Sequence, residues 1–60
     1  MEFKIKEIRL SKGITQKYVA KKVGISQSYL SNLEKNKFNP SAEIMFKIAD
    51  VLKCKVDDFR

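Results

Sequence analysis

One expected helix, residues 26–35, carries a row of uncharged side chains that form hydrogen bonds. At about 100° of rotation per residue, the side chains that share one side of this helix are Gln27, Ser28, Ser31, Asn32 and Lys35. Leu30 and Leu33 fall on the opposite side. Gln and Asn can each form two hydrogen bonds with adenine, and Ser can bond several bases. These residue types at this spacing indicate contact with base edges in DNA; a merely solvated polar face is the alternative interpretation.

The residues before this helix predict how it is held. Thr15 is a good N-cap for a helix over residues 15–23, and apolar residues follow it at helical spacing. Gly24 can end that helix, because glycine adopts the left-handed conformation with little strain. Ser26 is a second N-cap two residues later, so the next helix must leave at a steep angle. This order predicts a helix-turn-helix over about residues 15–36, which offers its second helix to the DNA major groove.

Positive charge is concentrated in the first two thirds of the chain. The net charge is +6, and residues 1–40 hold nine Lys or Arg against three Glu, whereas residues 41–60 hold four charges of each sign. A one-sided basic field suits a protein that binds a polyanion, because neutralised phosphates release counterions. A basic helix lying on a membrane surface is disfavoured, because the apolar positions are needed for a core.

Further helical segments are expected to support the helix-turn-helix. Residues 2–12 predict a helix that ends at Gly13, and Ser41 caps a helix over residues 42–52. A final short helix is expected at residues 57–59. A chain of 60 residues allows one domain with a small core, which buries only about 60% of the unfolded surface.

The ordered set of these residues resembles the Cro/C1-type helix-turn-helix family, also called lambda repressor-like or XRE-type. The resemblance covers about residues 5–59 and is carried by Arg9, Gly13-Ile14-Thr15-Gln16, Val19-Ala20, Val23-Gly24-Ile25-Ser26, Leu30-Ser31, Leu33-Glu34, Asn39-Pro40-Ser41, Ile48-Ala49, Leu52 and Val56-Asp57-Asp58-Phe59. It implies an all-α, compact five-helix domain over residues 1–60. The implied function is sequence-specific binding of double-stranded DNA by a repressor-like transcriptional regulator. By resemblance, this regulator is of the bacterial, archaeal or phage type and is cytoplasmic.

The face of the second helix and the resemblance together give a set of DNA contacts. The residues expected at base edges are Gln27, Ser28 and Asn32, with Ser31 and Tyr29 at the margins. The residues expected at backbone phosphates are Gln16, Lys17, Asn36 and Lys37. By resemblance, Gln16 also braces Gln27. Phosphate contacts of this kind position a protein on DNA but do not read its sequence.

Two further pairs follow from the resemblance. Arg9 and Glu34 match positions that form a structural salt bridge in the family, although two independent surface charges are the alternative. Val56 and Phe59 are expected to cover the core and are candidates for a dimer interface. A monomer of this size offers few contacts, so useful affinity predicts a homodimer on a near-palindromic operator, with half-sites about 10 bp apart.

The sequence departs from the family pattern at two positions. Tyr18 stands where many members have Glu, so it cannot close a capping box with Thr15. Lys53 stands where a glycine commonly ends the fourth helix, which predicts left-handed strain or a different helix end.

Two other classes of function compete with DNA binding. The alternative is a protein-interaction module of the same fold, such as an antitoxin that binds a partner protein; it is favoured by additional apolar residues around the helix over residues 42–52. An enzyme is not expected, because the chain has no His, no glycine-rich phosphate loop and no clustered inward carboxylates.

The same composition argues against bound cofactors and membranes. Cys54 is the single cysteine, so neither an internal disulfide nor a His/Cys zinc cluster is possible, and the thiol suits a reducing compartment as a small core residue. No apolar run approaches the roughly 18 residues of a transmembrane helix. Nothing in the sequence points to a cofactor, a metal ion or a small-molecule ligand.

Overall fold

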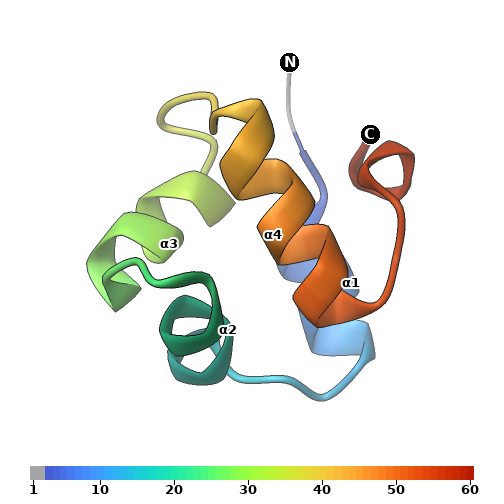
Figure 1. The fold of residues 1–60 in the computed structure, drawn as a ribbon, viewed down its shortest axis with the longest axis horizontal. Helices are drawn as coiled ribbons and strands as arrows, with labels where there is room; N and C mark the ends of the chain where they lie inside the picture. Colours follow the sequence, from blue (N-terminus) through green and yellow to red (C-terminus); the bar gives the residue numbers. More distant parts are fainter. Residues whose placement is uncertain (1–2) are drawn as a thin grey trace.

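The computed structural model describes residues 3–60 as a chain of helices, without strands in that range. Four α-helices follow in order: α1 (Ile5–Ser11), α2 (Gln16–Val23), α3 (Gln27–Glu34) and α4 (Ala42–Leu52). Figure 1 shows α4 at the centre of the molecule, with α1 behind it and α2 and α3 beside it. The all-α class therefore agrees with the sequence.

The expected fifth helix is a single 3₁₀ turn, η1 (Val56–Phe59). Its i+3 hydrogen bonds run from the Asp58 N–H to the Lys55 carbonyl (2.9 Å) and from the Arg60 N–H to the Asp57 carbonyl (3.2 Å). Four residues are too few for an α-helix of useful length, and the tighter 3₁₀ geometry is common in such short pieces. The five-helix expectation is therefore wrong in this detail.

Short polar residues set where three of the helices begin. The hydroxyls of Thr15, Ser26 and Ser41 accept hydrogen bonds from the N–H groups three residues later, over 3.1, 3.0 and 3.2 Å. Each bond satisfies one backbone donor that has no partner inside its own helix. These local signals explain why α2, α3 and α4 begin within one residue of the positions expected from the sequence.

The first helix is shorter than expected. It begins at Ile5 rather than residue 2, and its N-cap Lys4 makes no side-chain cap. Residue 2, the first residue of the expected helix, lies outside the described range. Phe3 and Lys4 instead tie the start of the chain to other segments: the Phe3 N–H donates to Asn36 Oδ1, and the Lys4 N–H donates to the Phe59 carbonyl.

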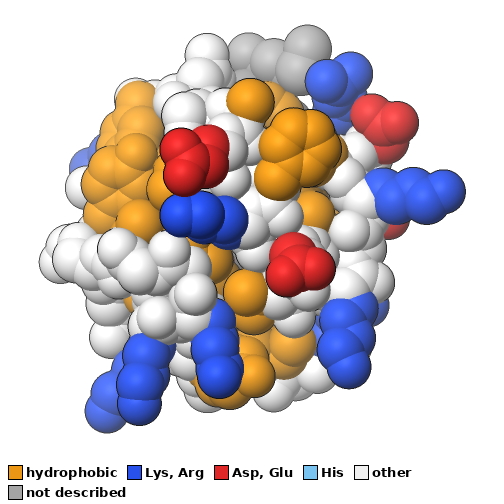
Figure 2. Space-filling model, in the orientation of Figure 1, with side chains coloured by type: hydrophobic (Ala, Val, Ile, Leu, Met, Phe, Trp, Pro, Cys, Tyr) orange, Lys and Arg blue, Asp and Glu red, His pale blue; other side chains and the backbone are white. Residues whose placement is uncertain are grey.

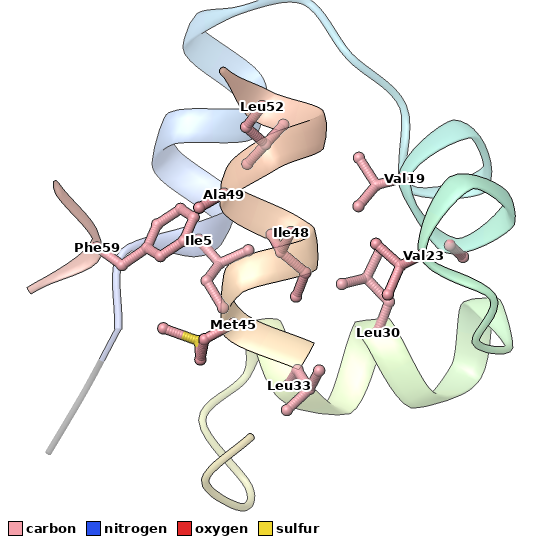
Figure 3. Close-up of a cluster of buried hydrophobic side chains, with 11 residues drawn as sticks. Ile5, Val19, Val23, Leu30, Leu33, Met45, Ile48, Ala49, Leu52 and Phe59 are labelled. Atoms are coloured by element: carbon pink, nitrogen blue, oxygen red, sulfur yellow. The ribbon is translucent and has the colours of Figure 1, made fainter. Parts of the chain in front are cut away.

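The core is built around α4. Figure 3 shows Val19 and Val23 from α2 pointing toward Leu30 of α3 and Ile48 of α4. The apolar side chains that are buried are Ile5, Val19, Ala20, Val23, Leu30, Leu33, Met45, Ile48, Ala49, Leu52 and Phe59. The inner faces of all four helices are thus used for packing, which leaves the outer face of α3 available. No helix within residues 3–60 has the length and apolar character needed to cross a membrane.

Candidate nucleic-acid interface

The outer face of α3 gathers the side chains that the sequence singled out. Gln27, Ser28 and Tyr29 are exposed, and Ser31 and Asn32 are half-buried. On the opposite side, Leu30 and Leu33 are buried in the core. The helix therefore presents amide and hydroxyl groups to solvent from a backbone that is fixed by packing.

The turn between α2 and α3 sets the direction in which this face points. Gly24 has a left-handed backbone with φ of 87°. The N–H groups of Gly24 and Ile25 both donate to the Ala20 carbonyl, over 2.9 and 3.0 Å, which ends α2 and begins the turn. Ala20 is buried, and its small side chain suits the close approach of α2 and α3.

A buried ion pair holds the far end of α3. Arg9 Nε donates to Glu34 Oε2 over 2.7 Å, and Arg9 Nη2 donates to Glu34 Oε1 over 3.1 Å. A third guanidinium nitrogen, Nη1, donates to the Ile14 carbonyl over 2.7 Å. Because both side chains are almost completely buried, this two-point pair joins α1 and the loop after it to the last residue of α3.

Gln16 belongs to this network. Its Nε2 donates to Glu34 Oε1 over 2.9 Å, and no bond to Gln27 is present among the described residues. The expected bracing of Gln27 by Gln16 is therefore not what the structure shows. The bond to Glu34 fixes the amide at the start of α2 and uses one of its two N–H hydrogens.

Asn36 also has a structural role that the sequence did not indicate. Its backbone is left-handed, with φ of 58°, and its Oδ1 accepts the Phe3 N–H over 2.9 Å. Asn36 is half-buried, and the hydrogen bond that its side chain makes uses the amide oxygen rather than the amide nitrogen. Lys17 and Lys37, the other candidates for phosphate contact, are both exposed.

Phe38, in the loop that follows α3, lies next to Tyr29 of that helix. Its ring lies 5.1 Å from that of Tyr29, centroid to centroid, at an interplanar angle of 58°, and both side chains are about 38% exposed. The pair forms an apolar border along one side of the α3 face. No periodic signal could have found this contact, because the two residues belong to a helix and to the loop that follows it.

The two candidates for a dimer interface differ in exposure. Val56 is half-buried, whereas the Phe59 side chain is completely buried in the core of its own chain. Phe59 therefore has no side-chain surface to offer to a second copy, and the expectation that it lies in a dimer interface does not fit this burial. The sequence also predicted that Phe59 covers the core, and its complete burial agrees with that role.

Titratable and metal-ligating groups add little to this site. No cluster of three or more potential metal ligands occurs within residues 3–60. Burial raises the pKa of the Cys54 thiol, and the nearby Asp58 carboxylate raises it further, while Lys12 acts in the opposite direction. Cys54 is a half-buried residue that packs against the core, as expected.

The chain matches known proteins along almost its whole length. The profile of the family described as "Helix-turn-helix" matches residues 5–59. The chain belongs to the helix-turn-helix family. The resemblance to its Cro/C1-type members, which rested on the ordered residues of the sequence, is thereby confirmed.

Relatives in this family carry names of regulators. An uncharacterised HTH-type transcriptional regulator of Archaeoglobus fulgidus is 41% identical over 58 residues, which are 97% of this chain and 83% of the relative. Among solved structures, SinR in complex with DNA superposes with a TM-score of 0.79 at 39% identity, covering 88% of this chain and 86% of the other. The restriction-modification controller protein C.AhdI of Aeromonas hydrophila gives a TM-score of 0.85 at 27% identity, covering 92% and 83%.

Proposed function

We propose that α3 reads the base sequence of duplex DNA in the major groove. The chain is a sequence-specific DNA-binding regulator of transcription, as its family and its relatives indicate. The assignment to α3 rests on one observation, which is that the two sides of this helix differ in chemistry. Leu30, Leu33 and Glu34 fix the inner side in the protein, and the outer side offers neutral donors and acceptors to a partner.

The proposed contacts divide into reading and positioning. The side chains proposed to read base edges are Gln27, Ser28 and Asn32, with Ser31 and Tyr29 at the margins. The side chains proposed to hold phosphates are Gln16, Lys17, Asn36 and Lys37. The hydrogen bond from Gln16 to Glu34 supports its part, because a fixed amide at a helix N-terminus loses little freedom when it binds phosphate. Repression of transcription by blocking a promoter is the form of regulation proposed.

A homodimer on a near-palindromic operator is proposed as the binding species. One α3 helix offers only a few base contacts, and two copies would read two half-sites about one helical turn, 10 bp, apart. Val56 is half-buried beside the C-terminal turn and is the remaining candidate of the expected interface.

Selection from a random pool of duplex DNA tests this function. Wild type would be compared with the triple variant Gln27→Ala/Ser28→Ala/Asn32→Ala at about 150 mM salt, which is near physiological ionic strength. A palindromic consensus from wild type that the variant fails to enrich is expected. The control Lys6→Ala/Glu7→Ala changes two exposed residues of α1 and should keep the consensus. Salt-sensitive binding without any consensus from wild type would contradict the proposal.

A protein-interaction module is the second candidate function. It is favoured by Phe46 on the outer side of α4, whose side chain is 65% exposed. A salt titration separates the two functions, because DNA binding weakens steeply as salt rises, whereas an apolar protein contact does not. The two activities would use different faces of the domain.

A further inference from the structure

A groove lies between α2 and the C-terminal end of α4, away from the residues proposed to read DNA. Its volume is about 550 Å³, and its lining residues are Lys12, Gly13, Ile14, Thr15, Tyr18, Val51, Leu52 and Lys53. In Figure 2 hydrophobic side chains form a strip at the bottom of the view, between the positions of α2 and α4, with basic side chains on both sides. None of the lining residues belongs to α3.

The groove has an apolar base and an aromatic wall. Ile14 and Val51 are half-buried and Leu52 is buried, so the base is fixed by the core. Tyr18 is 49% exposed, and its ring stands beside this base as a large surface without a covering segment among the described residues. An apolar side chain placed against Tyr18 and Val51 would remove both from water, which is favourable.

Positive charge surrounds this apolar base. Lys12 and Lys53 line the groove, and Lys22 Nζ lies 5.6 Å from the centroid of the Tyr18 ring. The lining residues include no carboxylate; Asp50 is the exposed residue just before Val51 but is not part of the lining. An occupant that combines an apolar group with negative charge is therefore complementary to the site.

The two positions at which the sequence departs from the family pattern both line this groove. Lys53 has a left-handed backbone with φ of 55°, where glycine would avoid strain. Tyr18 follows the N-cap Thr15 by three residues and cannot return the hydrogen bond that a Glu would give. Neither residue improves its own helix end, so the features that they add are a charge and an aromatic ring at the same site.

We propose that this groove docks an acidic peptide segment of a partner protein. One apolar side chain of the segment lies between Tyr18 and Val51, and its carboxylates pair with Lys12, Lys22 and Lys53. The volume accommodates a few side chains rather than a whole helix or a folded domain. Binding at this site is separate from the proposed reading of DNA and would let a partner act on the regulator without covering α3.

Selection from a library of displayed random 12-residue peptides tests the proposal with the wild-type chain as bait. Acidic peptides with a central apolar or aromatic residue are expected to dominate. The enriched peptide, labelled with fluorescein, is then titrated against wild type and variants by fluorescence anisotropy. Tyr18→Ala is expected to weaken binding about tenfold or more, as loss of an aromatic anchor does. Each of Lys12→Ala and Lys53→Gly is expected to weaken it about two- to fivefold.

The variant Lys53→Gly distinguishes a loss of peptide binding from a loss of folding. The change removes the ammonium group and also relieves the left-handed strain, so the variant should be at least as stable as wild type while it binds the peptide less well. Lys6→Ala, which removes the same charge from an exposed position outside the groove, should bind like wild type.

Three results would overturn the proposal. The first is a selection that enriches no peptide, and the second is enrichment of peptides without carboxylates. The third is an acidic peptide that binds Tyr18→Ala and Lys53→Gly as tightly as wild type, which would place it elsewhere on the basic surface. Failure here leaves the DNA selection untouched, because none of these variants changes α3.

Discussion

The guanidinium of Arg9 and the carboxylate of Glu34 lie side by side in the interior, joined by hydrogen bonds of 2.7 and 3.1 Å. All three guanidinium nitrogens and both carboxylate oxygens have a partner: Arg9 Nη1 also donates to the Ile14 carbonyl, and Glu34 Oε1 also accepts from Gln16 Nε2. No buried side-chain polar atom among the described residues lacks a partner. The pair therefore fixes α1, the following loop, the start of α2 and the end of α3 relative to one another.

Removing one member of this pair should unfold most of the protein. Arg9→Met leaves the Glu34 carboxylate buried without its cation, which costs about 3–5 kcal/mol. A core of this size supplies a stability on the order of 3–5 kcal/mol, so little would remain. Urea denaturation followed by circular dichroism measures the loss.

The double variant Arg9→Met/Glu34→Leu is the matched control. It removes both charges together, so it should recover a substantial part of the stability lost in Arg9→Met. A single variant within about 0.5 kcal/mol of wild type would show that the pair is a minor contact; ordinary surface changes have effects of that size.

Lysines at the DNA backbone should change the salt dependence of binding rather than its sequence preference. Lys17→Ala and Lys37→Ala should each reduce the slope of log K against log salt by about 0.9, because each phosphate contact releases condensed counterions. Affinity should fall by a similar factor for the operator and for unrelated duplexes. Lys47→Ala on α4 removes an equal charge and should leave the slope nearly unchanged. An altered consensus in either variant would mean that the lysine reads bases.

Local signals explain which parts of this fold could be predicted. Thr15, Ser26 and Ser41 act on N–H groups three residues away, so the sequence alone placed the starts of three helices. The outer face of α3 was also predictable, because helical periodicity separates Leu30 and Leu33 from the polar residues between them.

Contacts between distant residues explain what could not be predicted. The start of α1 is set by bonds from Phe3 to Asn36 and from Lys4 to Phe59, and no spacing within residues 2–12 indicates either one. The bond from Lys4 also holds the C-terminal turn against the core, where Phe59 is completely buried. Sequence reasoning therefore identified Phe59 as apolar and close to the core but could not tell whether it faced inward or toward a second copy.

Gly24 offers a test of the turn between the two central helices. A Cβ added there would have no atom within 4 Å, so the cost of Gly24→Ala comes from the left-handed backbone alone. The expected loss of stability is about 1–2 kcal/mol.

D-alanine at the same position fits a positive φ and should stabilise the protein by about 0.4–1 kcal/mol, because it restricts the unfolded chain. A chain of 60 residues can be made by chemical synthesis, and thermal unfolding of the two products gives both values. Equal stabilities would contradict the role assigned to the turn.

The Cys54 thiol reports on the loop between α4 and the C-terminal turn. Burial and the Asp58 carboxylate raise its pKa, so the protonated thiol is favoured in the folded state. The free energy of unfolding should therefore fall as pH rises from the ordinary pKa of an unfolded thiol through the raised pKa of the folded one.

The pH dependence of alkylation by iodoacetamide measures the pKa of the thiol directly, because Cys54 is the single cysteine. Asp58→Asn should lower the pKa by removing a negative charge, and Lys12→Ala should raise it by removing a positive one. Shifts in the same direction in both variants would mean that the loop had rearranged, because opposite charges removed from a fixed geometry must act in opposite directions.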